Sequence, residues 1–297
     1  LREELLLATG CTEPIAVAYC AAKLREVLGG KPEEVLAEVS GNILKNVKSV
    51  VVPNTDGRRG IDAAIAVGIV AGDADAELQV IANVTEDDAA AIQGYLDATP
   101  IKVTCPETPC LLDIFLHGKR EGHTAAVRVA NNHTNIIYIE RDGEILLEKP
   151  VTANAEDNLQ DKSVLNVKDI ITFAETVPLS TIEPIIGRQI ACNTAIAEEG
   201  LKNSWGANIG STLLQRGDDI ETQARAWAAA GSDARMNGCE MPVVICSGSG
   251  NQGITASVPV WKYGKLMGAD EEKILRAVCL SDLITIHQKT GIGRLSA

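Results

Sequence analysis

The residue types best suited to chemistry gather between positions 236 and 253. Cys239 directly follows Gly238, and a short apolar run then leads into the sequence Ser-Gly-Ser-Gly-Asn-Gln-Gly at 247–253. Glycine loses more backbone entropy on folding than other residues, and buried Ser, Asn and Gln side chains need hydrogen-bond partners. This composition is costly for a segment that only fills a core, so we expect it to hold a ligand.

The glycines of this loop match the pattern G-x-G-x-x-G, which is typical of dinucleotide-binding sites. Such a site also needs a second strand that ends in an acidic residue about 20 positions further on. Residues 254–267 instead have a helical pattern, and a further helix begins near Asp270. The sequence therefore argues against a nucleotide. Consecutive backbone N–H groups ahead of a helix also bind carboxylates, and we expect this of five loop residues: Ser247, Gly248, Ser249, Gly250 and Asn251.

Two further cysteines lie where helices could place them for chemistry. Cys11 precedes a predicted helix with Thr12 as its N-cap, so its thiol would lie at the positive end of a helix dipole. Cys279 lies near the middle of another predicted helix, on the face that also carries Asp282 and two apolar residues. Either cysteine could equally be a small hydrophobic residue that packs in a core.

A second polar segment, Ser-Gly-Asn-Ile-Leu-Lys-Asn at 40–46, follows a predicted strand. A turn of this composition that carries a lysine could bind a small anion. It could equally be an ordinary corner between a strand and a helix.

Composition limits the classes of function. The chain has 297 residues, 45% hydrophobic and only 3% aromatic, so its core must consist mostly of Ala, Val, Ile and Leu, which favours close packing of helices. A formal net charge of −13 argues against a nucleic-acid or anionic membrane partner. No apolar run reaches the roughly 18 residues of a membrane span, and no signal peptide is visible. The eight cysteines are therefore expected to be cytoplasmic thiols, some of them metal ligands or catalysts.

The pattern along the chain predicts an α+β protein: a mainly helical domain formed by both chain ends, with an antiparallel α+β module inserted between them. The helical domain would comprise 1–72 and 151–297, and the module 73–150. Asp142-Gly143 predicts a tight hairpin within the module. Helices are expected at 1–7, 15–28, 61–70, 86–96, 184–201, 218–230, 254–267 and 270–290, the last of them ended by Gly291. Strands are expected at 35–39, 78–84, 101–105, 111–116, 124–129, 135–140, 144–148 and 243–245, and a polar linker at 151–163.

Together these segments resemble the L-cysteine desulfidase family, which is related to the α portion of the iron–sulfur L-serine dehydratases. The resemblance covers the chain from its first residues to its last. The blocks that carry it are Thr-Gly-Cys-Thr-Glu-Pro at 9–14, Ser-Gly-Asn-Ile at 40–43 followed by Lys-Asn, Asn-Gly-Cys-Glu at 237–240, the loop at 247–253, and Cys-Leu-Ser at 279–281. Family members continue beyond the block at 291–297, so site residues of such a tail are expected outside this sequence.

The resemblance implies a [4Fe–4S] cluster held by three cysteines, and the matching positions are Cys11, Cys239 and Cys279. Three ligands leave one iron open as a Lewis acid, which would activate the sulfur of a bound cysteine as a leaving group. The products would be pyruvate, ammonia and sulfide, without pyridoxal phosphate. Cys246 is a weaker candidate for a supporting role. A shared cluster would require the N-terminal helix to pack against the C-terminal helices.

The base that removes the Cα proton is open among Lys45, Lys289 and His287. We favour Lys45 because it lies in the Ser-Gly-Asn block, where Asn42 would also contact the substrate. L-Serine is the nearest alternative substrate, since the same iron could activate a hydroxyl group. A non-catalytic amino-acid sensor, with the α+β module as its ligand-binding domain, is the more distant alternative. The expected partner is a small amino acid in each case, and a homo-oligomer is compatible with the sequence.

Overall fold

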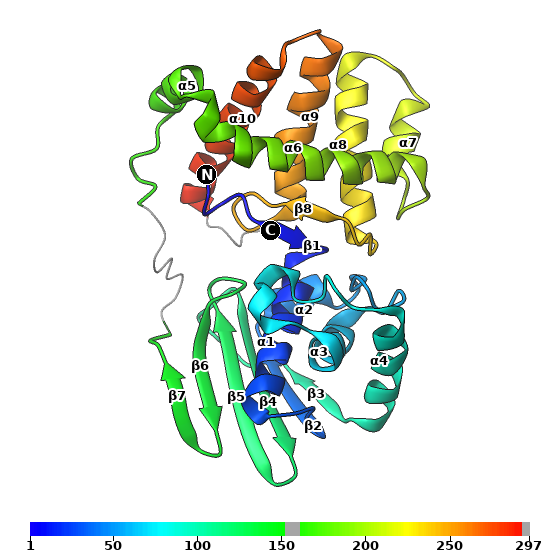
Figure 1. The fold of residues 1–297 in the computed structure, drawn as a ribbon, viewed down its shortest axis with the longest axis vertical. Helices are drawn as coiled ribbons and strands as arrows, with labels where there is room; N and C mark the ends of the chain where they lie inside the picture. The colour runs from blue at the N-terminus through cyan, green and yellow to red at the C-terminus, as the bar shows by residue number, and fades with distance from the viewer. Residues whose placement is uncertain (152–160, 293–297) are drawn as a thin grey trace. The chain divides into compact units, whose positions relative to one another are not determined.

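The computed structural model describes residues 1–151 and 161–292, and the chain divides into two compact units (Figure 1). The helical unit comprises Leu1–Gly10 and Asn158–Ala297, and the α/β unit comprises Cys11–Asp157. The α+β class predicted from the sequence is confirmed. Most of the predicted linker at 151–163 and of the block at 291–297 lies outside the described residues.

The α/β unit is built on a six-stranded sheet with the order β3-β2-β4-β5-β6-β7. Its neighbouring strands pair antiparallel except β2 and β3, which are parallel, so the sheet is mixed and the prediction of an antiparallel module is wrong at this edge. Asp142 and Gly143 both have positive φ and join β6 to β7, which confirms the predicted hairpin. The strands are β2 (Glu34–Val39), β3 (Ile101–Thr104), β4 (Asp113–Arg120), β5 (His123–Ala130), β6 (Ile136–Arg141) and β7 (Glu144–Glu148).

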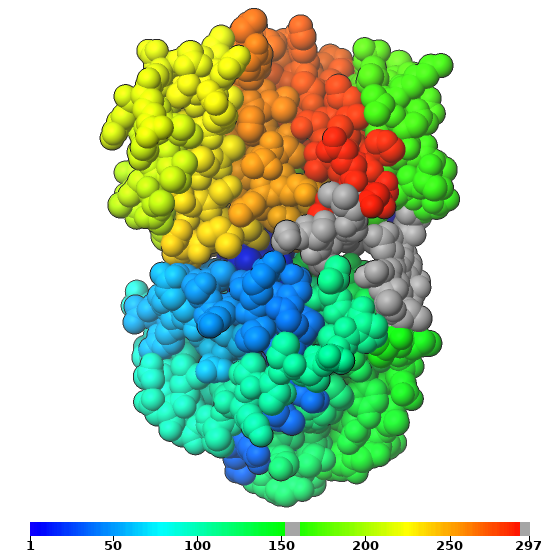
Figure 2. All heavy atoms as spheres, turned by 180° about the vertical axis from the view of Figure 1, so that it is seen from behind, coloured from blue at the N-terminus to red at the C-terminus, as the bar shows by residue number. Residues whose placement is uncertain are grey.

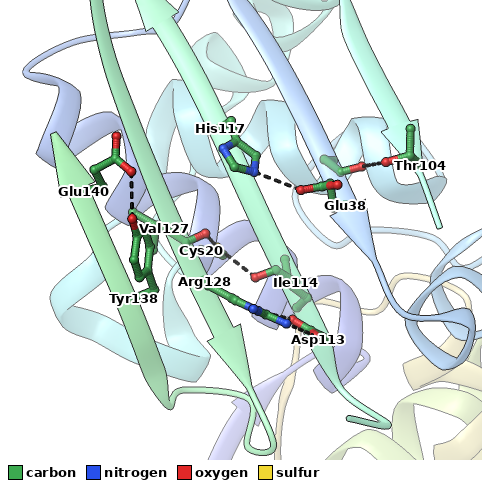
Figure 3. A network of polar contacts seen from close by, with 11 residues as sticks. Cys20, Glu38, Thr104, Asp113, Ile114, His117, Val127, Arg128, Tyr138 and Glu140 are labelled. Carbon is green, nitrogen blue, oxygen red and sulfur yellow. Dashed lines mark hydrogen bonds and ion pairs between the residues drawn. The ribbon is translucent and has the colours of Figure 1, made fainter. Parts of the chain in front are cut away.

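Helix α1 (Thr12–Leu28) covers one face of this sheet, where it packs against β4, β5 and β6. The opposite face carries a polar and aromatic network (Figure 3), in which Arg128 forms an ion pair with Asp113 at 2.6 Å. Helix α3 (Gly60–Ala71) packs on α1 so closely that a Cβ atom at Gly68 would lie 2.2 Å from the Ala18 carbonyl oxygen. The remaining helices of this unit are α2 (Gly41–Val47), a 3₁₀ helix (Ala74–Gln79) and α4 (Glu86–Ala98).

The helical unit contains a short antiparallel sheet in which β1 (Leu7–Thr9) pairs with β8 (Pro242–Val244). Around it lie α5 (Val167–Thr176), α6 (Leu179–Lys202), α7 (Ile209–Leu214), α8 (Ile220–Met236), α9 (Gly250–Leu266) and α10 (Glu271–Ile292). Figure 2 shows α9 and α10, in orange and red, side by side on one face of this unit. A Cβ atom at Gly200 of α6 would lie 2.1 Å from the Ala230 carbonyl oxygen of α8. This contact confirms the close helix packing expected from the low aromatic content.

Several local predictions differ from the structure. A helix is predicted at 1–7, but Leu7–Thr9 form β1, because their backbone pairs with a strand far along the chain. The predicted strand at 78–84 is absent, since the segment begins in a 3₁₀ helix and continues as turns. The N-cap of α1 is Cys11 rather than Thr12, and Gly291 lies within α10 instead of ending it.

The division of the chain also differs from the predicted boundary at residue 72. Strand β2 pairs with both β3 and β4, and α1 covers the sheet, so most of the N-terminal segment belongs with the α/β unit. Only Leu1–Gly10 of that segment belongs with the helical unit. Among the described residues, no single helix combines the length and apolar composition of a membrane span; α5 and α6, related by a 102° bend, meet that test only as a pair.

Candidate active site

The glycine-serine loop forms a two-residue hairpin turn shortly after β8. The Cys246 N–H donates to the Ser249 carbonyl oxygen at 3.0 Å, and the Ser249 N–H donates to the Cys246 carbonyl oxygen at 3.2 Å. Between them, Ser247 and Gly248 have φ values of 46° and 83°, as a type I′ turn requires. The Gln252 side chain also donates to the Cys246 carbonyl oxygen, at 3.1 Å. These bonds hold the turn in one geometry.

The turn leads directly into the N-terminus of α9. Ser249 is the N-cap, and its hydroxyl accepts a hydrogen bond from the Gln252 N–H at 3.3 Å. The Gly253 N–H donates to the Ser249 carbonyl oxygen at 3.0 Å, as the first turn of the helix requires. The N–H groups of Gly250 and Asn251 donate to no acceptor among the described residues. They lie at the positive end of the helix dipole and are available to an anion.

Buried polar side chains fix β8 beneath the loop. Asn193 of α6 is fully buried, and its Oδ1 accepts a hydrogen bond from the Val244 N–H at 2.8 Å. Its Nδ2 donates to the Val244 carbonyl oxygen and to the Ser257 hydroxyl, both at 3.0 Å. Helix α9 approaches β8 so closely that a Cβ atom at Gly253 would lie 2.1 Å from the Val244 carbonyl oxygen. Strand, turn and helix therefore form one rigid support.

A buried arginine that the sequence analysis does not single out also contacts the loop. Arg235, in the last turn of α8, is only 3% exposed. Its Nη1 donates to Asn251 Oδ1 at 2.9 Å, and its guanidinium lies against Gly250. The sequence signal for this residue is weak, because an arginine in the last turn of a helix ordinarily offsets the helix dipole at the surface.

Cys239 lies three residues beyond the end of α8, in the turn that ends this helix. Gly238 has a φ of 94°, and the Cys239 N–H donates to the Ala234 carbonyl oxygen at 3.0 Å. Burial raises the pKa of the Cys239 thiol, and the negative charges of Glu199 and Glu240 raise it further. The glycine break predicted before this cysteine is therefore the feature that positions it.

Cys279 and Cys246 belong to one buried core of the helical unit. Cys279 shares the buried face of α10 with Asp282, as predicted. Burial raises the pKa of Cys279 to about 11 and the pKa of Cys246 above its usual range, and the charge of Asp282 acts in the same direction on both. Burial also raises the pKa of Asp282 from 3.8 to about 7, although the Gln189 amide, which donates to Asp282 Oδ1 at 3.0 Å, opposes this shift. Both thiols are therefore neutral unless a metal binds the thiolate form.

The three candidates for the base lie in different surroundings. Lys45 is exposed on α2 and forms no hydrogen bond or ion pair with the described residues. His287 of α10 is half-buried, and its buried Nδ1 atom has no hydrogen-bond partner in the part of the chain that is described. Lys289 of the same helix is buried; burial lowers the pKa of its ammonium group, and the nearby Cys246 opposes that shift. Lys289, rather than Lys45, thus lies in the buried polar core.

In the α/β unit, Cys11 and Asn42 lie in one polar group around Glu13. The Cys11 thiol donates to Glu13 Oε2 at 3.1 Å. The Asn46 side chain donates to Glu13 Oε1 at 3.4 Å and to Asn42 Oδ1 at 3.5 Å. The fold therefore brings the first cysteine block and the Ser-Gly-Asn block together, as their joint use in a site would require.

Within residues 1–151 and 161–292, no group of three or more His, Cys, Asp or Glu side chains is placed to hold a metal ion. Cys11 belongs to the α/β unit, whereas Cys239 and Cys279 belong to the helical unit. All three cysteines are buried and none of them is in a disulfide bond, and thiolate sulfur is the ligand that holds iron–sulfur clusters. The donor set therefore fits such a cluster in its chemistry, and the gathering of these three thiols around it stays a prediction.

Comparison with known proteins places the chain in a family. Residues 75–297, which include Cys239, the loop and Cys279, match the model of the serine dehydratase alpha chain. The chain belongs to the serine dehydratase alpha-chain family. It is 50% identical over 298 residues to a UPF0597 protein of Desulfitobacterium hafniense (strain Y51). This alignment covers 100% of the chain and 69% of that protein.

UPF0597 proteins of Treponema denticola and Lachnoclostridium phytofermentans are each 48% identical to this chain. The alignments cover 100% of the chain and 70% and 71% of those two proteins. Membership of the serine dehydratase alpha-chain family confirms the predicted relation to the iron–sulfur serine dehydratases and indicates a lyase of that type.

Proposed function

We propose that this protein is an iron–sulfur-dependent lyase that converts L-cysteine and water to pyruvate, ammonia and hydrogen sulfide. The observation that carries the iron–sulfur lyase part of the proposal is the family match, because the matched segment contains Cys239, Cys279 and the loop, whereas L-cysteine as the substrate rests on the resemblance of the sequence blocks. Two features of the helical unit support it. Both thiols are buried and outside any disulfide, and at the start of α9 the N–H groups of Gly250 and Asn251, which have no acceptor in the described part of the chain, are available to a carboxylate.

The proposed cofactor is a [4Fe–4S] cluster with Cys11, Cys239 and Cys279 as its ligands. When bound through three cysteines, such a cluster supplies an open iron that acts as a Lewis acid on the leaving group. Cys246 shares the core with Cys279 and would support that side of the site.

The loop would orient the substrate. The N–H groups of Gly250 and Asn251 would hold the carboxylate, with the turn residues Ser247 and Gly248 and the cap Ser249 fixing the position of both donors. Asn42 would contribute a further polar contact. Holding the carboxylate in one place fixes the direction of the Cα–H bond relative to a base.

A base of the protein would take the Cα proton while the bond from Cβ to the leaving group breaks. The aminoacrylate so formed tautomerises and reacts with water to give pyruvate and ammonia. Lys45 is the residue that the sequence favours for this step. Lys289 is the second candidate, because burial lowers its pKa and so increases the fraction of free amine.

L-Serine is the second candidate substrate, and the name of the matching family favours it. Loss of its hydroxyl group follows the same course and yields pyruvate and ammonia. The preferred substrate is therefore the one whose leaving group the site activates better. The products distinguish the two reactions, because cysteine releases sulfide and serine does not.

The test is iron and sulfide analysis of anaerobically prepared protein, together with assays of sulfide release from L-cysteine and pyruvate release from L-serine. We expect Cys11→Ser, Cys239→Ser and Cys279→Ser each to lose the cluster and the activity. Cys105→Ser changes an exposed thiol and should keep both. A cluster that survives one of the three replacements would remove that residue from the ligand set. If cluster-loaded protein binds amino acids but turns over neither L-cysteine nor L-serine, it is a sensor instead of a lyase.

A further inference from the structure

Arg235 is a buried cation with no matching anion among the described residues. Its Nε atom has no hydrogen-bond partner, and no carboxylate of the described residues forms an ion pair with it. Removing a guanidinium from water without giving it a counter-charge is strongly unfavourable. Arg128 in the α/β unit is more exposed, yet it is paired with Asp113 at 2.6 Å. The Nε atom of Arg235 therefore needs a hydrogen-bond acceptor, and a bound anion would supply one.

The guanidinium lies at a second positive feature, the N-terminus of α9. A Cβ atom at Gly250 would lie 2.2 Å from Arg235 Nε and 2.5 Å from its Cζ, so the absence of a side chain at Gly250 admits the guanidinium. Asn251 Oδ1 accepts a hydrogen bond from Nη1 at 2.9 Å, and it lies on the same first turn in which the N–H groups of Gly250 and Asn251 meet no acceptor among the described residues. A guanidinium and a helix N-terminus repel one another unless an anion lies near both.

We propose that Arg235 and the first N–H groups of α9 together bind the carboxylate of a small amino acid. A guanidinium presents parallel N–H groups that match the two oxygens of a carboxylate. The inference rests on the proposed function in one respect, since the amino acid would be the substrate of the lyase. Arg235 then acts as the residue that selects amino acids over amines of the same shape.

Binding of L-alanine tests this directly, because it carries the carboxylate and the amine but no leaving group. Ethylamine is the matched probe without a carboxylate, and inorganic phosphate is the matched probe for a different anion. Calorimetric titration of cluster-loaded protein should show binding of L-alanine and much weaker binding of ethylamine and phosphate. Arg235→Gln should lower the affinity for L-alanine about 10- to 100-fold, the loss expected for charge-assisted hydrogen bonds. Arg225→Gln changes an exposed arginine of the same helix and should leave the affinity unchanged.

Gly250→Ala tests the same contact without removing the charge. Its Cβ atom would displace the guanidinium, so we expect a loss of affinity similar to that of Arg235→Gln. Arg235→Lys should recover part of the affinity, because it keeps the charge but not the paired donors. Circular dichroism and iron content show whether each variant folds and holds the cluster. If one of Arg235→Gln, Gly250→Ala and Arg235→Lys does not fold, the comparison uses the two that do.

The outcomes separate this inference from the proposed function. Unchanged L-alanine affinity and an unchanged KM for the substrate in folded Arg235→Gln would overturn the role of Arg235 and leave the lyase intact. Arg235-dependent binding of phosphate but not of L-alanine would overturn the carboxylate assignment. Arg235-dependent binding of L-alanine in a protein without any lyase activity would support the inference while the proposed function fails.

Discussion

The three glycines of the loop owe their positions to three different contacts. Gly248 supplies the positive φ of the turn, Gly250 leaves room for the Arg235 guanidinium, and Gly253 lets α9 close against β8. In dinucleotide-binding folds the second glycine of this pattern admits a pyrophosphate. Here a side chain of the same chain lies beside it. The pattern thus identifies a strand, a turn and a helix, and the residues around it decide the ligand.

Asp282 leads to a prediction about pH. Its pKa of about 7 in the folded protein lies above 3.8, so between these values the folded state holds a proton that the unfolded state has lost. The free energy of unfolding should therefore fall as the pH rises through this range, by about 1.4 kcal/mol for each unit of pKa difference at most. Asp282→Asn keeps the acceptor for Gln189 and should remove this dependence in iron-free protein, as chemical denaturation at pH 5 and pH 8 would measure.

Asp218→Asn is the control, because Asp218 belongs to the same unit, lies just before α8 and is exposed. Its denaturation curves should change with pH as those of the unaltered protein do. If the difference in free energy of unfolding between the unaltered protein and Asp282→Asn is the same at pH 5 and at pH 8, Asp282 ionises normally and the prediction is wrong.

At the scale of elements, the contact between α9 and β8 predicts that Gly253 is one of the glycines of the helical unit that cannot carry a side chain without loss of stability. Gly253→Ala would place a Cβ atom 2.1 Å from the Val244 carbonyl oxygen and should lower the free energy of unfolding by about 1–3 kcal/mol, the range for overpacked cores. Gly187→Ala in α6 meets no atom within 4 Å and should raise it by about 0.4–1 kcal/mol. Urea denaturation of the two variants measures both changes, and equal effects would contradict the close packing of α9 on β8.

Elements with a complete local signal were predictable from the sequence. The hairpin at Asp142-Gly143 needs only two residues that tolerate positive φ, and β7 has the bounds that were predicted. Strand β1 was missed because Leu7 becomes a strand residue only by pairing with Val244. Arg235 and Asn193 were missed for a related reason, since the burial of a polar side chain depends on helices that are distant in sequence. The loop and the face of Cys279 depend on local patterns alone, and both were predicted.

At the scale of the whole molecule, the two units have separate secondary structure and can be followed by separate probes. The three tryptophans, Trp205, Trp227 and Trp261, all lie in the helical unit, so tryptophan fluorescence reports that unit. Amide hydrogen exchange in β4 and β5 reports the sheet of the α/β unit. The proposed ligands come from both units, since Cys11 belongs to one and Cys239 and Cys279 belong to the other.

These probes test whether the proposed cluster links the units. Iron-free protein should unfold in two transitions, because each unit has the size and the packed interior of a domain. A cluster bound by thiols of both units stabilises both together, so loading should make the fluorescence and exchange transitions coincide. Cys11→Ser should keep the transitions apart under the same loading conditions, whereas Cys105→Ser should behave as the unaltered protein does. If loading shifts only the fluorescence transition, the cluster is held by the helical unit alone and Cys11 is not a ligand.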